Sequence, residues 1–222
     1  MVLTGSNQQL YETHIKFYSE FISNLAELEH FIAEKLEYQE DMTPRRMINT
    51  VQRLLTLSDE MENIKPGKRD LSIFFILTCV ESLFTLQKQE VRIQKQEMII
   101  RFFNEYIDYT DKQFLIDKVK ISKIGEEQPY FNSITIEQIA LLMCVIRNKV
   151  AHEGIYWSFS FYDESQDFSI LNIINSKLRK DQGYQLITYE VDLTYNDFRK
   201  ICMKGFINFL NDYFRRNCSK NM

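Results

Sequence analysis

Apolar residues recur every three or four positions through the first half of the chain, which is the spacing of an amphipathic α-helix. This pattern predicts one long helix over residues 10–38 and a second over 43–61, where Thr43 stands as N-cap before a proline. A third predicted helix, 71–87, starts after Asp70 as its cap. It is apolar on almost every side, so we expect it at the centre of a helical bundle.

Helical spacing continues into the second half. It predicts helices over residues 91–109, 111–121 and 136–152, with a loop over 125–133. The last of these helices has the strongest start signal, because Thr135 and the glutamine three positions later form a capping box.

From residue 155 on, the apolar residues stand at every second position, which is typical of strands. Residues 155–162 and 185–193 alternate in this way and are predicted to pair as antiparallel strands. A short helix is expected between them, over 165–179, and a final helix over 194–215. The predicted fold class is therefore mainly α, a helical bundle with a small antiparallel β insertion at about 155–193.

Composition supports a mostly helical chain. The 222 residues include only six glycines and three prolines, which favours long helices over a many-turned β fold. We expect residues 1–222 to form a single domain, with 1–64 as an N-terminal helical extension and 70–216 as the core.

Charge and cysteine usage narrow the function classes. A net charge of −4 excludes a broadly basic nucleic-acid coat protein. No metal-ligand spacing is present, so no metal site or cofactor is predicted, and the four cysteines are expected as buried free thiols in a reducing compartment. Neither a signal peptide nor a membrane span is predicted, so the expected location is cytoplasmic.

The segment from Arg147 to His152 is the strongest candidate for chemistry. On a helical wheel, Arg147 lies at the border of the apolar stripe, while Asn148 and His152 lie one turn apart on the polar side. The three are predicted to form an arc open to a substrate or a second subunit, and Gly154 is expected to end the helix in the left-handed conformation. A permanently charged arginine and a histidine that titrates near neutral pH suit phosphodiester chemistry. The structural alternative is a capping histidine and a surface ion pair.

The run Arg147-Asn148-Lys149-Val150-Ala151-His152 resembles the signature of the HEPN (higher eukaryote and prokaryote nucleotide-binding) domain family. That signature has an arginine, four to six residues and a histidine, often with asparagine directly after the arginine. The apolar helix upstream resembles the HEPN helix that bears an inward polar or acidic residue, which would be Glu81. The resemblance covers about residues 70–216 and implies a HEPN-like bundle.

The resemblance implies a metal-independent endoribonuclease that acts as a homodimer and serves defence or toxin-type growth arrest. It assigns His152 to proton transfer at the ribose 2′-hydroxyl or the leaving oxygen, Arg147 to the scissile phosphate, and Asn148 to positioning. Lys149, Tyr156 and Glu81 are the expected substrate-binding residues. RNA is the implied partner, and an antitoxin or regulatory protein is a further one.

One departure from the family pattern, and the variety of the family itself, leave alternatives open. HEPN toxins often have a tyrosine two residues after the histidine, but Gly154 stands there and Tyr156 is the nearest tyrosine, so regulation through that tyrosine is in doubt. Other HEPN-like domains have lost catalysis and bind a nucleotide or a protein instead.

Secondary candidates have ordinary structural explanations. Tyr156, Trp157 and Phe159 can stack on bases, but alternating aromatics more often pack a core. Two short basic stretches, one of them around Arg45, can contact phosphates or form a solvated helix face. His14 and His30 have no metal-ligand spacing and receive no role.

Overall fold

The mainly α prediction, with a small antiparallel sheet, is confirmed by the computed structural model of the chain. The structure describes residues 5–65, 69–87, 93–123, 134–162, 170–173 and 187–218. In chain order these contain α1 (Gly5–Tyr18), α2 (Leu25–Glu37), α3 (Thr43–Ile64), α4 (Arg69–Leu86), α5 (Lys95–Glu105), α6 (Tyr109–Asp117), β1 (Val119–Lys123), α7 (Ile136–Asn148), the π-helix η1 (Lys149–Glu153), β2 (Ile170–Ile173), β3 (Ile187–Val191) and α8 (Tyr195–Asn217).

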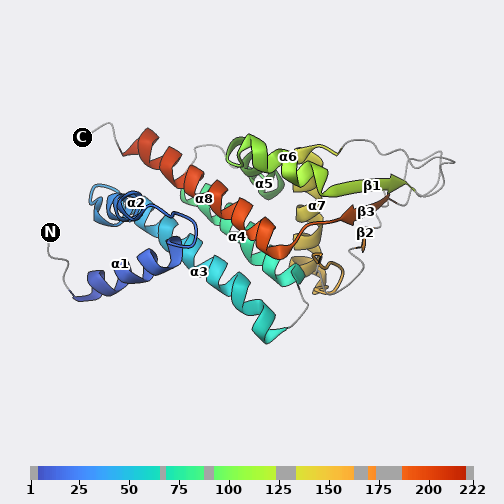
Figure 1. The fold of residues 1–222 in the computed structure, drawn as a ribbon, viewed down its shortest axis with the longest axis horizontal. Coiled ribbons are helices and arrows are strands. Elements are labelled where there is room, and N and C mark those ends of the chain that lie inside the picture. The colour runs from blue at the N-terminus through green and yellow to red at the C-terminus, as the bar shows by residue number, and fades with distance from the viewer. Residues whose placement is uncertain are drawn as a thin grey trace.

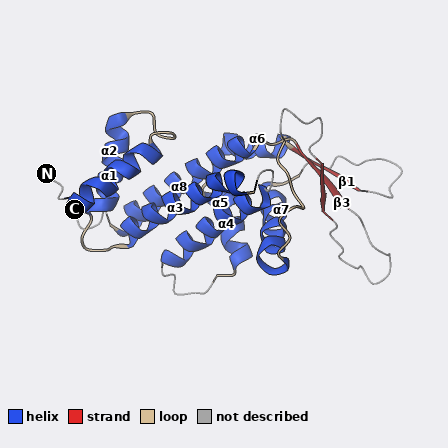
Figure 2. Cartoon of the chain, turned by 90° about the horizontal axis from the view of Figure 1, so that it is seen from below, coloured by secondary structure: helices blue, strands red, loops and turns tan. Residues whose placement is uncertain are grey.

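The long helices α3, α4 and α8 run side by side along the molecule (Figure 1). Most side chains of α4 are buried, in line with its apolar sequence, while one face that includes Phe74, Phe75 and Thr78 is half-buried. The helices α5 and α7 pack on each other and on α4. The N-terminal helices α1 and α2 lie at one end of the molecule, and the sheet lies at the other, next to α7 (Figures 1 and 2).

The predicted long helix over residues 10–38 is wrong, because the chain breaks into α1 and α2. Asn24 causes the second helix to start afresh: its side-chain oxygen accepts hydrogen bonds from the backbone N–H groups of Ala26 (3.0 Å) and Glu27 (3.2 Å). Such a cap satisfies donors that a continuous helix would direct at its own carbonyls. Because the helical spacing of apolar residues continues across this break, the sequence pattern did not reveal it.

The β insertion is placed differently from the prediction. β3 forms the centre of the sheet, between β1 and β2, and both pairs are antiparallel. Residues 155–162 do not form a strand, although one backbone hydrogen bond links the N–H of Tyr162 to the carbonyl of Leu193 (2.9 Å). The buried carboxylate of Asp70 accepts from the backbone N–H groups of Ser158 and Phe159, so these two groups cannot join a ladder.

Three other boundaries need correction. The helix predicted over 111–121 is the shorter α6, and its last predicted residues belong to β1 instead. The helix predicted over 165–179 is wrong where the structure describes this range, because residues 170–173 form the strand β2. The other residues of the range lie outside the described part of the chain, as does the predicted loop over 125–133. Within 91–109, the helix α5 is limited to Lys95–Glu105.

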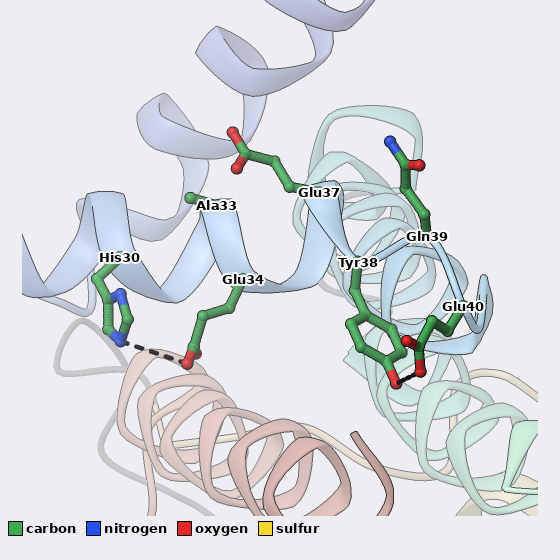
Figure 3. Close-up of a pocket in the computed structure, with 7 residues that line it drawn as sticks. All are labelled: His30, Ala33, Glu34, Glu37, Tyr38, Gln39 and Glu40. Atoms are coloured by element: carbon green, nitrogen blue, oxygen red, sulfur yellow. Dashed lines mark hydrogen bonds and ion pairs between the residues drawn. The ribbon is translucent and has the colours of Figure 1, made fainter. Parts of the chain in front are cut away.

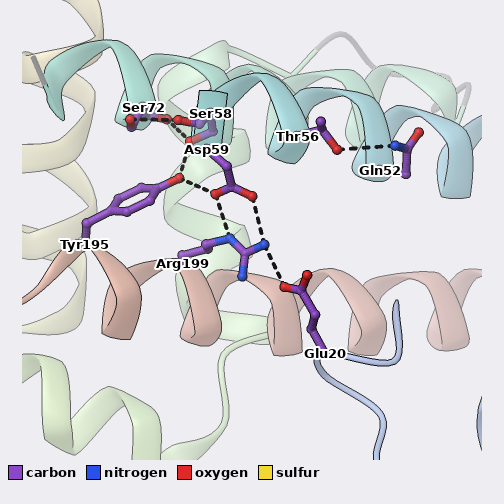
Figure 4. Close-up of polar contacts among 8 residues, drawn as sticks. All are labelled: Glu20, Gln52, Thr56, Ser58, Asp59, Ser72, Tyr195 and Arg199. Atoms are coloured by element: carbon purple, nitrogen blue, oxygen red, sulfur yellow. Dashed lines mark hydrogen bonds and ion pairs between the residues drawn. The ribbon is translucent and has the colours of Figure 1, made fainter. Parts of the chain in front are cut away.

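A polar network ties α8 to α3 and to the turn that follows α1 (Figure 4). Arg199 donates from Nε to Asp59 Oδ1 (2.7 Å) and from Nη2 to Asp59 Oδ2 (2.8 Å), and it also contacts Glu20 (3.0 Å). Tyr195 donates to Asp59 Oδ1 (2.8 Å) and contacts the Ser58 hydroxyl (2.7 Å). This forked arginine–carboxylate pair fixes the position of α8 against α3.

Candidate functional site

The helix α7 sets the position of the Arg147–His152 segment. It opens with the predicted capping box, in which Thr135 and Gln138 satisfy each other's backbone N–H groups (3.2 and 2.9 Å). Its buried face packs on α4 and α5. Because the start of the helix and its buried face are both fixed, its last turn holds Arg147 against the centre of the bundle.

The α-helix then widens into the π-helix η1, which contains His152. Gly154 ends it with φ 67°, in the left-handed conformation that the sequence predicts, and its N–H donates to the carbonyl of Lys149. The N–H of Ile155 donates to the same carbonyl (3.1 Å). His152 and Asn148 are exposed, whereas Lys149 is half-buried. Single π turns of this kind are frequent at functional sites.

Arg147 does not lie open to solvent, which corrects the predicted exposed arc. Only 6% of its surface is exposed. Its Nη2 donates to Glu81 Oε2 (2.8 Å), and its Nη1 donates to Asn148 Oδ1 (3.1 Å). The helical wheel put this residue at a border, but α4 packs over that border and brings Glu81 to it.

Lys95 also contacts Glu81, and sequence reasoning missed it. Its Nζ lies 3.4 Å from Glu81 Oε2, the same oxygen that Arg147 contacts, while 67% of the lysine side chain is exposed. Two cations therefore share one carboxylate, and the solvent-facing charge of the cluster is that of Lys95. No motif includes this lysine, since it reaches the site only through the packing of α5 on α4 and α7.

The Glu81–Arg147 pair is incompletely satisfied. Glu81 Oε1 and Arg147 Nε are buried and have no hydrogen-bond partner among the described residues. A buried polar atom without a partner costs stability, so such atoms often mark groups kept for another reason. Nearby, burial and, as a smaller cause, the charge of Glu81 raise the pKa of the Cys144 thiol to about 12. This thiol is therefore not a nucleophile at neutral pH.

Asp70 anchors the segment that follows the π-helix. Its Oδ2 accepts from the N–H (3.1 Å) and the hydroxyl (2.9 Å) of Ser158, and its Oδ1 accepts from the N–H of Phe159 (3.1 Å). The residue was predicted to cap α4, but it lies inside the first turn of that helix. Burial raises the pKa of this carboxyl group, and the three hydrogen bonds oppose that shift.

The structure therefore brings some of the predicted site residues into contact, but these residues differ in how deeply they are buried. Glu81, Arg147 and Asn148 form one connected chain of contacts, with His152 in the next turn. Tyr156 is half-buried, and its ring meets Trp157 edge-on (5.2 Å).

The other candidates add no chemistry at this site. A groove of about 570 Å³ lies along the end of α2, far from α7, and is lined by His30, Ala33, Glu34, Glu37, Tyr38, Gln39 and Glu40 (Figures 1 and 3). Its acidic lining has the wrong charge for a phosphate. Among the described residues, no group of three or more histidine, cysteine or acidic side chains is arranged to hold a metal ion. Of the helices in the described ranges, none is long and apolar enough to cross a membrane.

Comparison with protein-family models, with curated proteins and with solved structures found no match.

Proposed function

We propose that this protein is a metal-independent endoribonuclease in which His152 transfers protons and a second copy of the chain completes the site. The observation that carries the proposal is the placement of His152. It is exposed on a π turn, next to an exposed Asn148 that is tied to a buried arginine. An accessible imidazole can act as general base and general acid near neutral pH.

The chemistry requires two imidazoles. One His152 removes the proton from a ribose 2′-hydroxyl, and the 2′-oxygen attacks the adjacent phosphorus. The bond from phosphorus to the 5′-oxygen breaks, and the His152 of the second copy gives its proton to that leaving oxygen. The products are a 2′,3′-cyclic phosphate and a 5′-hydroxyl. A symmetric homodimer supplies acid and base from one residue position.

Arg147 acts in this proposal through Asn148. Its guanidinium is already held by Glu81 and has little exposure, so it fixes Asn148 by donating to Oδ1. The amide Nδ2 of Asn148 then remains as a donor for a phosphate oxygen. The positive charge next to the phosphate comes from the Lys95–Glu81–Arg147 cluster, which carries one more cation than anion.

The burial of Arg147 also favours a second candidate. An arginine committed to Glu81 is typical of a structural ion pair, and the site would then belong to a non-catalytic module that binds a nucleotide or a protein. The two candidates differ in whether His152 is required for a reaction.

Incubation of the purified protein with total RNA in EDTA tests the proposal. Wild type is expected to cleave, and His152→Ala is expected to lower the rate about 100-fold or more. His30→Ala is the matched control, because His30 is an exposed histidine on α2 paired only with Glu34 (3.3 Å) among the described contacts. It should cleave as wild type does.

Two results would reject the nuclease mechanism: cleavage that needs magnesium, or cleavage that His152→Ala retains. No cleavage by any form of the protein would favour the binding module. His152→Ala should not disturb folding, because the side chain is exposed, so circular dichroism of the variant serves as the check.

A further inference from the structure

Trp157 is the chain's single tryptophan, and it is held in an exposed position five residues after His152. It is 62% exposed, whereas Phe159 and Phe161 of the same segment are buried and pack edge-on against each other (4.8 Å). Tryptophan is highly buried on average in folded proteins, so a tryptophan that is held exposed is a candidate contact residue.

Both sides of Trp157 are fixed by hydrogen bonds. After it, Ser158 and Phe159 are bound through three contacts to the buried Asp70. Before it, the N–H of Ile155 donates to the carbonyl of Lys149. The exposure of the indole therefore does not come from a loosely attached loop, because the backbone on either side is anchored to α4 or to η1.

The indole stands alone as an exposed apolar group of its segment. Among residues 152–162, it is the one large apolar side chain that is exposed. Next to it in sequence are a half-buried Tyr156, whose ring stands edge-on to the indole, and a half-buried Ser158. A single exposed flat ring suits a nucleobase, which offers one π face, better than a bilayer or an apolar helix, which need a continuous apolar patch.

We propose that Trp157 is a stacking platform for a base of single-stranded RNA, and that Asp70 is the positioning residue that holds the segment of Trp157 in place. The inference rests on the proposed ribonuclease function and adds the residue that binds the substrate. It assigns stacking to Trp157 instead of the half-buried Tyr156 or the buried Phe159. Since every base has a π face, the contact selects unpaired bases over a duplex and not one sequence over another.

Because the chain contains one tryptophan, fluorescence excited at wavelengths that its twelve tyrosines do not absorb reports on this residue alone. The probe is a short 2′-O-methyl oligoribonucleotide of mixed sequence, which cannot form the cyclic phosphate and so stays intact. We expect saturable quenching by the single strand and much weaker quenching by a duplex of the same sequence. Equal quenching by the duplex, or by phospholipid vesicles, would overturn the stacking assignment.

Affinity measured by polarisation of a labelled probe gives the second readout. Trp157→Leu is expected to weaken binding about 5- to 100-fold, and Trp157→Phe less, because a phenyl ring keeps a π face. Tyr109→Leu is the control, since Tyr109 is an aromatic residue of similar exposure (74%) on α6. Asp70→Asn is expected to weaken binding while the protein stays folded, because one amide oxygen cannot accept at both former carboxylate positions. Unchanged affinity in Trp157→Leu would contradict the inference.

The His152→Ala variant separates this inference from the proposed function. If it retains quenching and loses cleavage, both stand. If it still cleaves RNA while quenching is normal, the catalytic proposal fails and the base platform remains. If Trp157→Leu binds and cleaves as wild type does while His152→Ala is inactive, only the base platform is wrong.

Discussion

Two arginines of this protein, the half-buried Arg199 and the buried Arg147, are bound to carboxylates in different ways. Arg199 meets Asp59 with two parallel hydrogen bonds of 2.7 and 2.8 Å and reaches Glu20 as well (Figure 4). Arg147 meets Glu81 through one nitrogen, shares that oxygen with Lys95, and leaves its own Nε and Glu81 Oε1 without partners among the described residues. The first pair is complete within the fold, whereas the second has unused hydrogen-bonding capacity next to exposed polar groups.

The difference separates a pair that is complete within the fold from one that is not. An arginine that makes two hydrogen bonds to one carboxylate stabilises the folded protein without any ligand. An incompletely paired buried cluster costs stability, and the cost is offset if the cluster serves a ligand or a reaction. The proposed function assigns that role to the Arg147 cluster.

The largest stability effect is expected for Arg199→Ala. Removing the guanidinium leaves Asp59 without its main partner, at a cost of about 3 kcal/mol, which lowers the melting temperature by roughly 6–12 °C in a chain of this size. The ribonuclease activity per folded molecule should be unchanged. A normal melting temperature, or a loss of activity in the folded variant, would contradict this assignment.

Arg147→Ala is expected to cost about 2–3 kcal/mol, because Lys95 remains as a partner for Glu81. The double variant Glu81→Gln/Arg147→Met should be closer to wild type in stability, since no charge is left buried and unpaired. Both variants should lose RNA cleavage, because Asn148 loses its anchor. If the double variant is stable and fully active, the cluster has no role in the reaction.

Lys95→Gln is expected to leave stability within about 0.5 kcal/mol, because the side chain is mostly exposed. It should weaken RNA binding several-fold, and the slope of log affinity against log salt concentration should fall by about one. Lys204→Gln is the matched control, an exposed lysine that pairs with Asp111 (2.9 Å) on α6. Equal effects of the two variants would mean that Lys95 contributes only general charge.

The smallest effect concerns His14, another buried group with an unpaired atom. Its Nε2 contacts Asn49 Oδ1 (2.8 Å), while Nδ1 has no partner among the described residues. Burial lowers the pKa of His14 from its ordinary 6.5, and the charges of Arg45 and Arg53 lower it further, against the hydrogen bond to Asn49.

The unfolded chain therefore binds this proton more readily than the folded one. Stability from His14 is complete above about pH 6.5 and is lost as the pH falls from there through the lowered folded value. The unfolding free energy of wild type should decrease relative to His14→Gln below that pH, and the difference should be constant above it. If the difference between wild type and His14→Gln does not change with pH, the pKa of His14 is not lowered in the folded protein and this prediction is wrong.

The sequence predicted the features that depend on neighbouring residues. The capping box at Thr135 and the left-handed Gly154 follow from local spacing, and both are confirmed. The apolar pattern of α4 predicted its central place, although one face of this helix is only half-buried. The predicted burial of the four free cysteines is confirmed as well.

Features set by distant packing were not predictable in this way. The Glu81–Arg147 contact joins residues 66 positions apart, and the hold of Asp70 on Ser158 joins residues 88 positions apart. A helical wheel gives the direction of Arg147 but not the depth at which α4 covers it. The strand β1 was missed because its partner, β3, is far along the chain and five residues carry little periodicity.

The most direct test of the central claim is the chemistry of the new RNA ends. Cleavage of a defined oligoribonucleotide in EDTA by wild type should give a 2′,3′-cyclic phosphate and a 5′-hydroxyl, as read by mass spectrometry. A single 2′-deoxy substitution at the cleaved position should prevent the cut, and His152→Ala should give no product. A 3′-hydroxyl with a 5′-phosphate, or cleavage at the deoxy position, would contradict a mechanism in which the imidazole of His152 activates the ribose hydroxyl.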